Sequence, residues 1–159
     1  MTASRLTRRD WAVLALSGLA WPVVHAAPEL PNAESLPAAL AEAQQRKQPL
    51  VVMVSLRGCA FCKVVRESYL YPLQQNGLPV VQVNMRDHRA LTDWDGTVTT
   101  QDAWVRKLGI TLAPTVLFFG AQGREVAARL KGAYLPDFYN AYLEEQLAVA
   151  RRAVQGGST

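Results

Sequence analysis

The chain has 159 residues, of which half are hydrophobic and 19% are charged, a composition that suits one globular domain with a short leader. The formal net charge falls by two, from +4 to +2, without residues 1–26, because that segment holds Arg5, Arg8, Arg9 and Asp10. So small an excess, with no basic run interleaved with aromatic residues, argues against nucleic acid or an anionic membrane as a partner.

Residues 1–26 have the pattern of an export signal. Basic residues open the segment, and the apolar stretch that follows, residues 11–24, is too short to span a bilayer comfortably. Small residues favour cleavage after Ala26, with Ala27 as the alternative. The mature protein is therefore expected to begin at Ala27 or Pro28.

The basic part of this leader resembles a twin-arginine signal. Arg8 and Arg9 form the arginine pair, although Trp11-Ala12-Val13 stands where that signal usually has Phe-Leu. The general secretory route and an uncleaved membrane anchor are the alternatives. Both export routes lead to an oxidising space, the periplasm or the cell surface, where disulfides persist. We therefore expect a soluble periplasmic protein.

The chain after the leader alternates helical and strand-like segments. Residues 27–33 are expected to be an extended linker, and Ser35 is expected to cap a helix over residues 36–48 that Pro49 ends. Residues 50–54 form a continuously apolar run rich in β-branched side chains. This pattern is typical of a strand that is buried on both faces of a sheet.

The middle of the chain contains a helix, a strand and a polar segment. The helix is expected over residues 59–75, and Pro72 within it should kink or end it. A second apolar strand is expected over residues 78–83. Residues 84–98 are polar and carry several charges, which indicates a surface insertion.

The last third of the chain continues the alternation. Its expected elements are a helix over 101–108 capped by Thr99 or Thr100, a strand over 115–119, a turn over 120–123, a returning strand over 125–131, a helix over 136–154 and a disordered tail over 155–159. The order predicts an α/β three-layer sandwich within residues 34–154. We expect a mixed central sheet of about four to five strands, the central ones parallel, flanked by helices.

Cys59 and Cys62 are the only cysteines, and they lie three residues apart between an apolar strand and a helix. Cys59 is thus expected at a helix N-terminus, where N–H groups and the helix dipole stabilise a thiolate and lower the pKa of the thiol. A structural zinc site needs four ligands, and only His88 is another strong candidate outside the leader. A static disulfide that closes so short a loop removes little entropy. A redox-active pair is therefore favoured over both alternatives.

Several segments, in their order and spacing, resemble the thioredoxin superfamily. They are residues 50–54, Gly58-Cys59-Ala60-Phe61-Cys62-Lys63, residues 108–119 with Ala113-Pro114-Thr115, Gly123-Arg124-Glu125 and Lys131-Gly132-Ala133. Asp93-Trp94-Asp95-Gly96, with Thr99-Thr100, is similar to an extra loop of the SoxW-type periplasmic thioredoxins. The resemblance covers roughly residues 34–150. It implies a thioredoxin-like fold and an exported thiol–disulfide oxidoreductase.

The resemblance also implies roles for particular residues. Cys59 and Cys62 are the expected catalytic residues, and Pro114 is the expected cis-proline facing them. The Ala113 backbone is expected to pair with an extended substrate segment, and Phe61 to cover the disulfide and contact partners. Ala113, Pro114 and Phe61 are thus the expected substrate-binding residues. The alternatives are a trans proline that only begins a strand and a Phe61 that only packs.

Three features depart from the family pattern. Arg57-Gly58 stands where thioredoxins usually carry Trp, and Met53 stands where they carry a buried Asp that helps to move protons to the second cysteine. Ala60-Phe61 is neither the Gly-Pro of thioredoxin nor the Pro-His of strong oxidants, which implies an intermediate potential on the reducing side. Arg57 and Lys63 either stabilise the thiolate or are solvated surface charges.

The predicted function is thiol–disulfide exchange with protein substrates that carry disulfides or thiols, with reduction favoured. The protein is expected to be a monomer with no cofactor beyond the Cys59–Cys62 disulfide. A reductase in an oxidising space needs an electron donor, for which a membrane carrier is expected. The alternatives are a soft-metal chaperone for Cu(I), although no Met or His cluster accompanies the cysteines, and a binding module with an inert disulfide.

Overall fold

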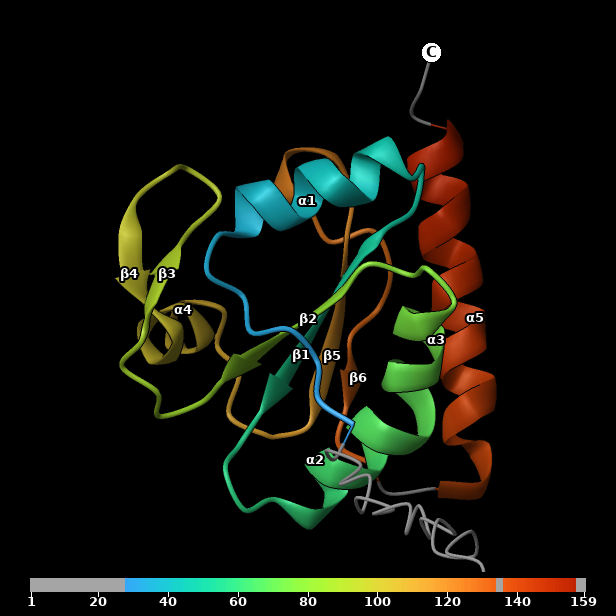
Figure 1. The fold of residues 1–159 in the computed structure, drawn as a ribbon. Coiled ribbons are helices and arrows are strands. Elements are labelled where there is room, and N and C mark those ends of the chain that lie inside the picture. The colour runs from blue at the N-terminus through green and yellow to red at the C-terminus, as the bar shows by residue number, and fades with distance from the viewer. Residues whose placement is uncertain (1–27, 134–135, 157–159) are drawn as a thin grey trace, which may run out of the picture.

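The computed structural model describes residues 28–133 and 136–156, in which helices cover both faces of a four-stranded sheet (Figure 1). The strand order is β2-β1-β5-β6. The strands are β1 (Leu50–Ser55), β2 (Val80–Asn84), β5 (Thr115–Phe119) and β6 (Leu130–Lys131). This mixed α/β sandwich is the predicted fold class. Among the described residues, no helix is both long and apolar enough to cross a membrane.

The direction of one strand pair differs from the prediction. β1 runs parallel to β2, as expected, but antiparallel to β5, with Val54 opposite Thr115. β5 therefore starts at the end of the sheet where β1 and β2 finish. A parallel partner would need a crossover that returns the chain to the opposite end. The segment between β2 and β5 contains only a small hairpin and a short helix at this end, and it makes no such return.

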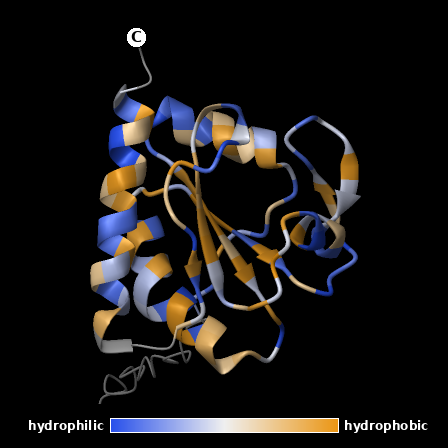
Figure 2. Cartoon of the chain, turned by 180° about the vertical axis from the view of Figure 1, so that it is seen from behind, coloured by the Kyte–Doolittle hydropathy of each residue, from blue (hydrophilic) through white to orange (hydrophobic). Residues whose placement is uncertain are grey.

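Strand β1 lies at the centre of two hydrophobic layers because its side chains alternate between the faces of the sheet. Val51 and Met53 pack with the Cys62 helix and with helix α5 (Pro136–Gly156). Leu50, Val52 and Val54 pack against the helices on the other face. All six residues of the strand are buried, as its continuously apolar sequence predicted. Figure 2 shows the central strands as a predominantly hydrophobic layer between helices of mixed character.

Helix α1 (Leu36–Gln45) begins as predicted and ends earlier. The Ser35 hydroxyl accepts a hydrogen bond from the Ala38 N–H at 3.3 Å, which is an N-cap. The helix stops three residues before the predicted end, and Lys47 adopts a left-handed conformation with φ of 54°. Proline disfavours helical geometry in the residue before it, so the chain turns ahead of Pro49 into β1.

The helix after the cysteines is continuous through Pro72 and contains a wide turn. It consists of α2 (Ala60–Val64), the π-helical segment η1 (Val65–Leu70) and α3 (Tyr71–Gln75). Proline has no N–H to donate, and its ring crowds the carbonyl four residues earlier. The π segment ends at Leu70, two residues before Pro72, so the helical geometry changes there while the helix continues. The helix therefore does not end at Pro72, which was one of the two outcomes that the sequence predicted.

The polar segment 84–98 is more structured than a surface insertion. It contributes the antiparallel strands β3 (Ala90–Thr92) and β4 (Val98–Thr100), followed by helix α4 (Gln101–Lys107). Asp93, in the turn of this hairpin, is only 2% exposed. It accepts hydrogen bonds from Trp104 Nε1 at 3.1 Å and Lys107 Nζ at 2.6 Å. The hairpin is therefore fastened to α4 by a buried carboxylate.

The last predicted strand and helix differ from the structure in their bounds. The returning strand predicted over 125–131 is reduced to β6 and an isolated bridge between Phe119 and Glu125, after the 3₁₀ turn η2 (Ala121–Gly123). Helix α5 runs to Gly156, so the tail predicted from residue 155 begins two residues too early. The leader and residues 157–159 lie outside the described residues.

The predicted linker is extended but belongs to the domain. The Gln82 N–H donates to the Pro31 carbonyl at 2.7 Å, and the Ala33 N–H donates to the Gln82 carbonyl at 2.8 Å. Leu30 is buried in the core. These contacts place the segment beside β2, at the edge of the sheet.

Candidate active site

Cys59 caps the helix that follows β1. Its backbone is extended, with φ of −80° and ψ of 111°, and the Cys62 N–H donates to its Sγ atom at 3.1 Å. The two cysteines form a disulfide with their Cα atoms 5.2 Å apart. The prediction that Cys59 stands at a helix N-terminus is therefore confirmed. An N–H directed at this sulfur favours its thiolate in the reduced protein.

The two sulfurs differ in accessibility. Cys59 is partly exposed at the surface, whereas Cys62 is 1% exposed and packs in the core with Val65 and Met53. A protein substrate can therefore reach Cys59 but not Cys62. This difference suits Cys59 as the attacking nucleophile and Cys62 as the residue that resolves a mixed disulfide.

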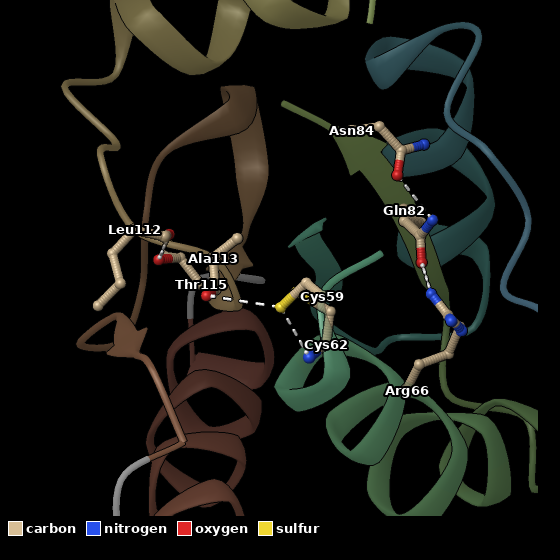
Figure 3. Close-up of a disulfide and its surroundings, with 8 residues drawn as sticks. All are labelled: Cys59, Cys62, Arg66, Gln82, Asn84, Leu112, Ala113 and Thr115. Carbon is tan, nitrogen blue, oxygen red and sulfur yellow. Dashed lines mark hydrogen bonds between the residues drawn. A yellow bond between two sulfur atoms is a disulfide. The ribbon is translucent and has the colours of Figure 1, made fainter. Parts of the chain in front are cut away.

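A backbone wall faces Cys59 from the end of β5. The Ala113–Pro114 peptide bond is cis, and the Ala113 carbonyl oxygen lies 3.9 Å from Cys59 Sγ. The Thr115 hydroxyl donates to the Leu112 carbonyl at 2.7 Å and holds the turn (Figure 3). Pro114 itself is buried. The structure thus brings together Cys59 and Ala113, which are far apart in the sequence.

Phe61 and Met53 occupy contrasting environments. Phe61 is 62% exposed on α2, next to the half-exposed Val64, so it is not a core-packing residue. Met53 is fully buried in the same cluster as Cys62. The position where thioredoxins carry a proton-transferring Asp is thus filled by an apolar side chain. His88 is exposed, and the described residues contain no group of three or more His, Cys, Asp or Glu placed to hold a metal.

On the side away from Ala113, Cys59 borders a cavity of about 780 Å³. Its walls come from the loop between β1 and α2, from the start of the helix, and from the segment that follows β2. Arg57 and Lys63, which were predicted to lie near the thiolate, both line it. Arg66, Arg86 and Arg89 also line it, and the sequence reasoning missed all three.

A signal for two of these arginines was present in the sequence. β1 and β2 are parallel strands, and the carboxyl ends of parallel strands meet at one edge of the sheet. Arg86 and Arg89 follow β2 as Arg57 and Cys59 follow β1. Their place after the strand therefore predicts a position near the cysteines. The position of Arg66 at the cavity depends on how the helix is rotated about its own axis, and no sequence pattern predicted it.

A chain of side-chain hydrogen bonds lines this cavity. Arg66 Nη1 donates to Gln82 Oε1 at 3.1 Å, Gln82 Nε2 donates to Asn84 Oδ1 at 3.0 Å, and Asn84 Nδ2 donates to Asn32 Oδ1 at 2.8 Å. Figure 3 shows Arg66, Gln82 and Asn84 on the opposite side of Cys59 from Leu112 and Ala113. Such a network holds each member in one orientation.

With Glu29, Asp87 is one of the two acidic residues that line this cavity. A side-chain hydrogen bond from Arg89, supported by the Arg89 backbone N–H and the nearby charge of Arg57, holds the pKa of this carboxyl below its usual range. The Arg89 Nη2 atom lies 2.7 Å from Asp87 Oδ2. Asp87 therefore stays ionised at neutral pH and neutralises the charge of Arg89.

The sequence matches the thioredoxin-like domain family over residues 36–147. No curated protein matches it. Among solved structures, one called DsbH oxidoreductase is similar with 19% identity and a TM-score of 0.53, over 77% of this chain and 88% of the other. A thioredoxin from Thermus thermophilus is similar with 21% identity and a TM-score of 0.50, over 82% and 92% of the two chains. At these identities the structural likeness concerns the fold alone.

Proposed function

The chain belongs to the thioredoxin-like family, and from this premise we propose that it is a thiol–disulfide oxidoreductase acting on protein partners. The observation that carries the proposal is the asymmetry of the Cys59–Cys62 pair. Cys59 is partly exposed and receives an N–H hydrogen bond on its sulfur, while Cys62 is buried within disulfide-bonding distance. One accessible, stabilised thiolate and one protected resolving thiol are what two-step exchange requires.

The exchange begins with the reduced protein. The Cys59 thiolate attacks one sulfur of a substrate disulfide, that S–S bond breaks, and the leaving sulfur departs as a thiolate that takes a proton from solvent. Cys62 then gives up its thiol proton to solvent and attacks Cys59 Sγ. The mixed disulfide breaks and the second substrate thiolate leaves. Two electrons have passed to the substrate, and the Cys59–Cys62 disulfide has formed.

The backbone wall orients the substrate in this scheme. The Ala113 carbonyl stands 3.9 Å from Cys59 Sγ, so an extended substrate segment that pairs with it places its own sulfur beside Cys59. Pro114 is buried, and the hydrogen bond from the Thr115 hydroxyl to the Leu112 carbonyl holds this turn. Phe61, exposed on α2, offers apolar contact to the same partner.

We favour the reductive direction, in the periplasm or at the cell surface. Ala60-Phe61 places no histidine between the cysteines, and the export-signal pattern of residues 1–26 supports the location. The Asp93-Trp94-Asp95-Gly96 turn supports a relationship to SoxW-type thioredoxins, which are exported. Each turnover consumes two electrons, so the scheme requires a dithiol donor, for which we propose a membrane electron carrier.

Redox titration and turnover test the proposed activity. Equilibration against glutathione buffers should give a potential below that of glutathione, and the protein should reduce insulin with an added dithiol donor. Cys59→Ser should lose this turnover, and Cys62→Ser should accumulate a mixed disulfide that mass spectrometry detects. Ser68→Ala, an exposed change on the same helix, is the matched control. A potential near that of strong periplasmic oxidants would reverse the direction, and tight Cu(I) binding without exchange would refute the activity.

The export route is tested separately. Replacing Arg8 and Arg9 by lysine in the full chain should abolish cleavage and release of the mature protein if the twin-arginine route is used. Fractionation of cells that express the two chains measures this. Export that continues unchanged in the double variant would assign the leader to the general secretory route.

A further inference from the structure

The cavity beside Cys59 concentrates positive charge. Five cationic residues line it, and they are Arg57, Lys63, Arg66, Arg86 and Arg89. Only two carboxylates, Glu29 and Asp87, share this lining. Five cationic and two acidic residues give the cavity a formal charge of +3, which is larger than the +2 of residues 27–159 as a whole.

Most of this charge is not neutralised locally. Arg89 pairs with Asp87, and Arg66 Nε lies 3.9 Å from Glu29 Oε2 but has no hydrogen-bond partner. Within the described part of the chain, Arg57, Lys63 and Arg86 form no salt bridge. A cavity in which one sign of charge predominates attracts ligands of the opposite sign and raises their association rate.

The far wall of the cavity is held in place. The Arg86 N–H donates to Asp102 Oδ1 at 2.8 Å, and the Asp102 N–H donates to the Asp87 carbonyl at 3.0 Å. The Gln101 N–H donates to the Arg89 carbonyl at 3.0 Å. These bonds fasten the loop after β2 to the first turn of α4.

Arg86 has a backbone that arginine rarely adopts. Its φ is 58°, in the left-handed region that disfavours residues with a Cβ atom. Strained residues of this kind persist where the surrounding structure holds them, and they cluster at binding sites. The hydrogen bonds of this loop thus hold Arg86 at the cavity in a backbone conformation that it would otherwise leave.

We propose that this cavity binds carboxylate side chains next to the substrate cysteine, so that the preferred partner presents its disulfide in an acidic segment. The inference rests on the proposed function and specifies its substrate class. The cations come from three segments around an open space of about 780 Å³, which suits several side chains of a peptide better than one small anion. The Ala113 wall holds the main chain of the substrate, and the cavity receives its acidic side chains on the other side of Cys59.

Matched peptides test the preference. Three peptides, each with one internal disulfide, carry Glu, Gln or Lys beside the attacked cysteine and are otherwise identical. Pre-reduced protein is mixed with each peptide, the reaction is quenched with acid, and released thiols are separated by chromatography. At low ionic strength the Glu peptide should react about tenfold faster than the Gln peptide, and the Lys peptide should react more slowly. Salt should reduce the difference, because ions screen exposed charges.

Charge-removing variants locate the effect. Arg57→Gln combined with Arg86→Gln should lower the ratio of Glu-peptide to Gln-peptide rates from about ten towards one. Arg124→Gln is the matched control, because Arg124 is also exposed but lines a different cavity, between α1 and the end of α5. Circular dichroism melting checks that the variants fold. The ratio should stay unchanged in the control.

The outcomes separate this inference from the proposed activity. Equal rates for Glu and Gln peptides, or a ratio that the cavity variants leave intact, would overturn the acidic preference while exchange itself stands. No reduction of any peptide by the unmodified protein would refute the activity. Oxidised glutathione is a further probe: if the cavity variants slow its reduction and leave the Glu peptide unaffected, a small carboxylate-bearing disulfide is the ligand and the peptide assignment is wrong.

Discussion

The two sides of Cys59 offer a substrate different kinds of contact. On one side the Ala113 carbonyl lies 3.9 Å from the sulfur, and the contact is with main-chain atoms. On the other side, arginine and lysine side chains line a cavity. Every residue except proline carries the same backbone donor and acceptor, so in the proposed scheme the first wall accepts almost any extended segment. A cluster of cations distinguishes substrates by charge, so the second wall supplies selectivity.

The two walls are also built differently. The Ala113 wall depends on the register between β1 and β5, which places Val54 opposite Thr115 in the centre of the sheet. The charged wall depends on a loop at the edge of the sheet and on how the β3–β4 hairpin and α4 dock beside it. In the proposed scheme, reactivity therefore depends on the core, and selectivity depends on a peripheral attachment that can be weakened separately.

The largest change expected from breaking the peripheral attachment comes from Asp93→Ala. The substitution leaves the buried Trp104 Nε1 without an acceptor and removes the partner of Lys107, which should cost about 2 kcal/mol of unfolding free energy. Chemical denaturation measures the loss. Asp95→Asn, an exposed change in the same turn, is the control and should have little effect. Equal stabilities of the Asp93→Ala and unmodified proteins would contradict the role of the buried carboxylate.

Phe61→Ala should weaken partner binding without changing charge preference. Burial of this exposed ring against a partner accounts for about 1.4 kcal/mol, or about tenfold in KM, for acidic and neutral peptides alike. Steady-state kinetics with both peptides measure it, and Val98→Ala, an exposed apolar residue on β4, is the control. A selective loss for the acidic peptide would contradict the division between the two walls.

Asp102→Ala should loosen the charged wall specifically. It removes the acceptor of the Arg86 N–H and the ion pair with Arg106, so the loop loses a fixed position. The acidic-to-neutral rate ratio should fall about threefold, because without this hydrogen bond the loop holds Arg86 at the cavity for only part of the time. Asp102→Asn keeps an acceptor oxygen and should restore most of the ratio. A ratio unchanged in Asp102→Ala would show that the loop needs no anchor there.

The smallest expected effect is a gain from Asp87→Asn. Removing this carboxylate releases Arg89 and should raise the acidic-to-neutral ratio about twofold, measured with the same peptides. Because the pKa of Asp87 is lowered in the folded protein, its stabilising contribution is complete above the usual carboxyl pKa and is lost as pH falls through the lowered value. The variant should therefore be slightly less sensitive to acid in pH-dependent unfolding. A lower ratio would instead assign Asp87 a binding role.

Local sequence signals predicted the features that depend on neighbouring residues. Ser35 and Thr100 cap their helices, and Cys59 stands at a helix start, because N-caps are made with N–H groups two or three residues away. The sequence of β1 also predicted its burial on both faces, since a continuous apolar run is visible within a few residues. The fold class followed from the order of such segments and is confirmed, whereas the reactivity of Cys59 and Cys62 stays a prediction.

The tertiary structure decided the features that depend on residues distant in the sequence. The polar composition of residues 84–98 predicted a position on the surface. Asp93 is nevertheless buried, because Trp104 and Lys107 donate hydrogen bonds to its carboxylate. The antiparallel pairing of β5 with β1 depends on where α4 ends, which no local pattern states. The basic cavity likewise exists only because two parallel strands end at one edge of the sheet. Local sequence sets a residue's own conformation, whereas its charged neighbours are set by packing across the whole chain.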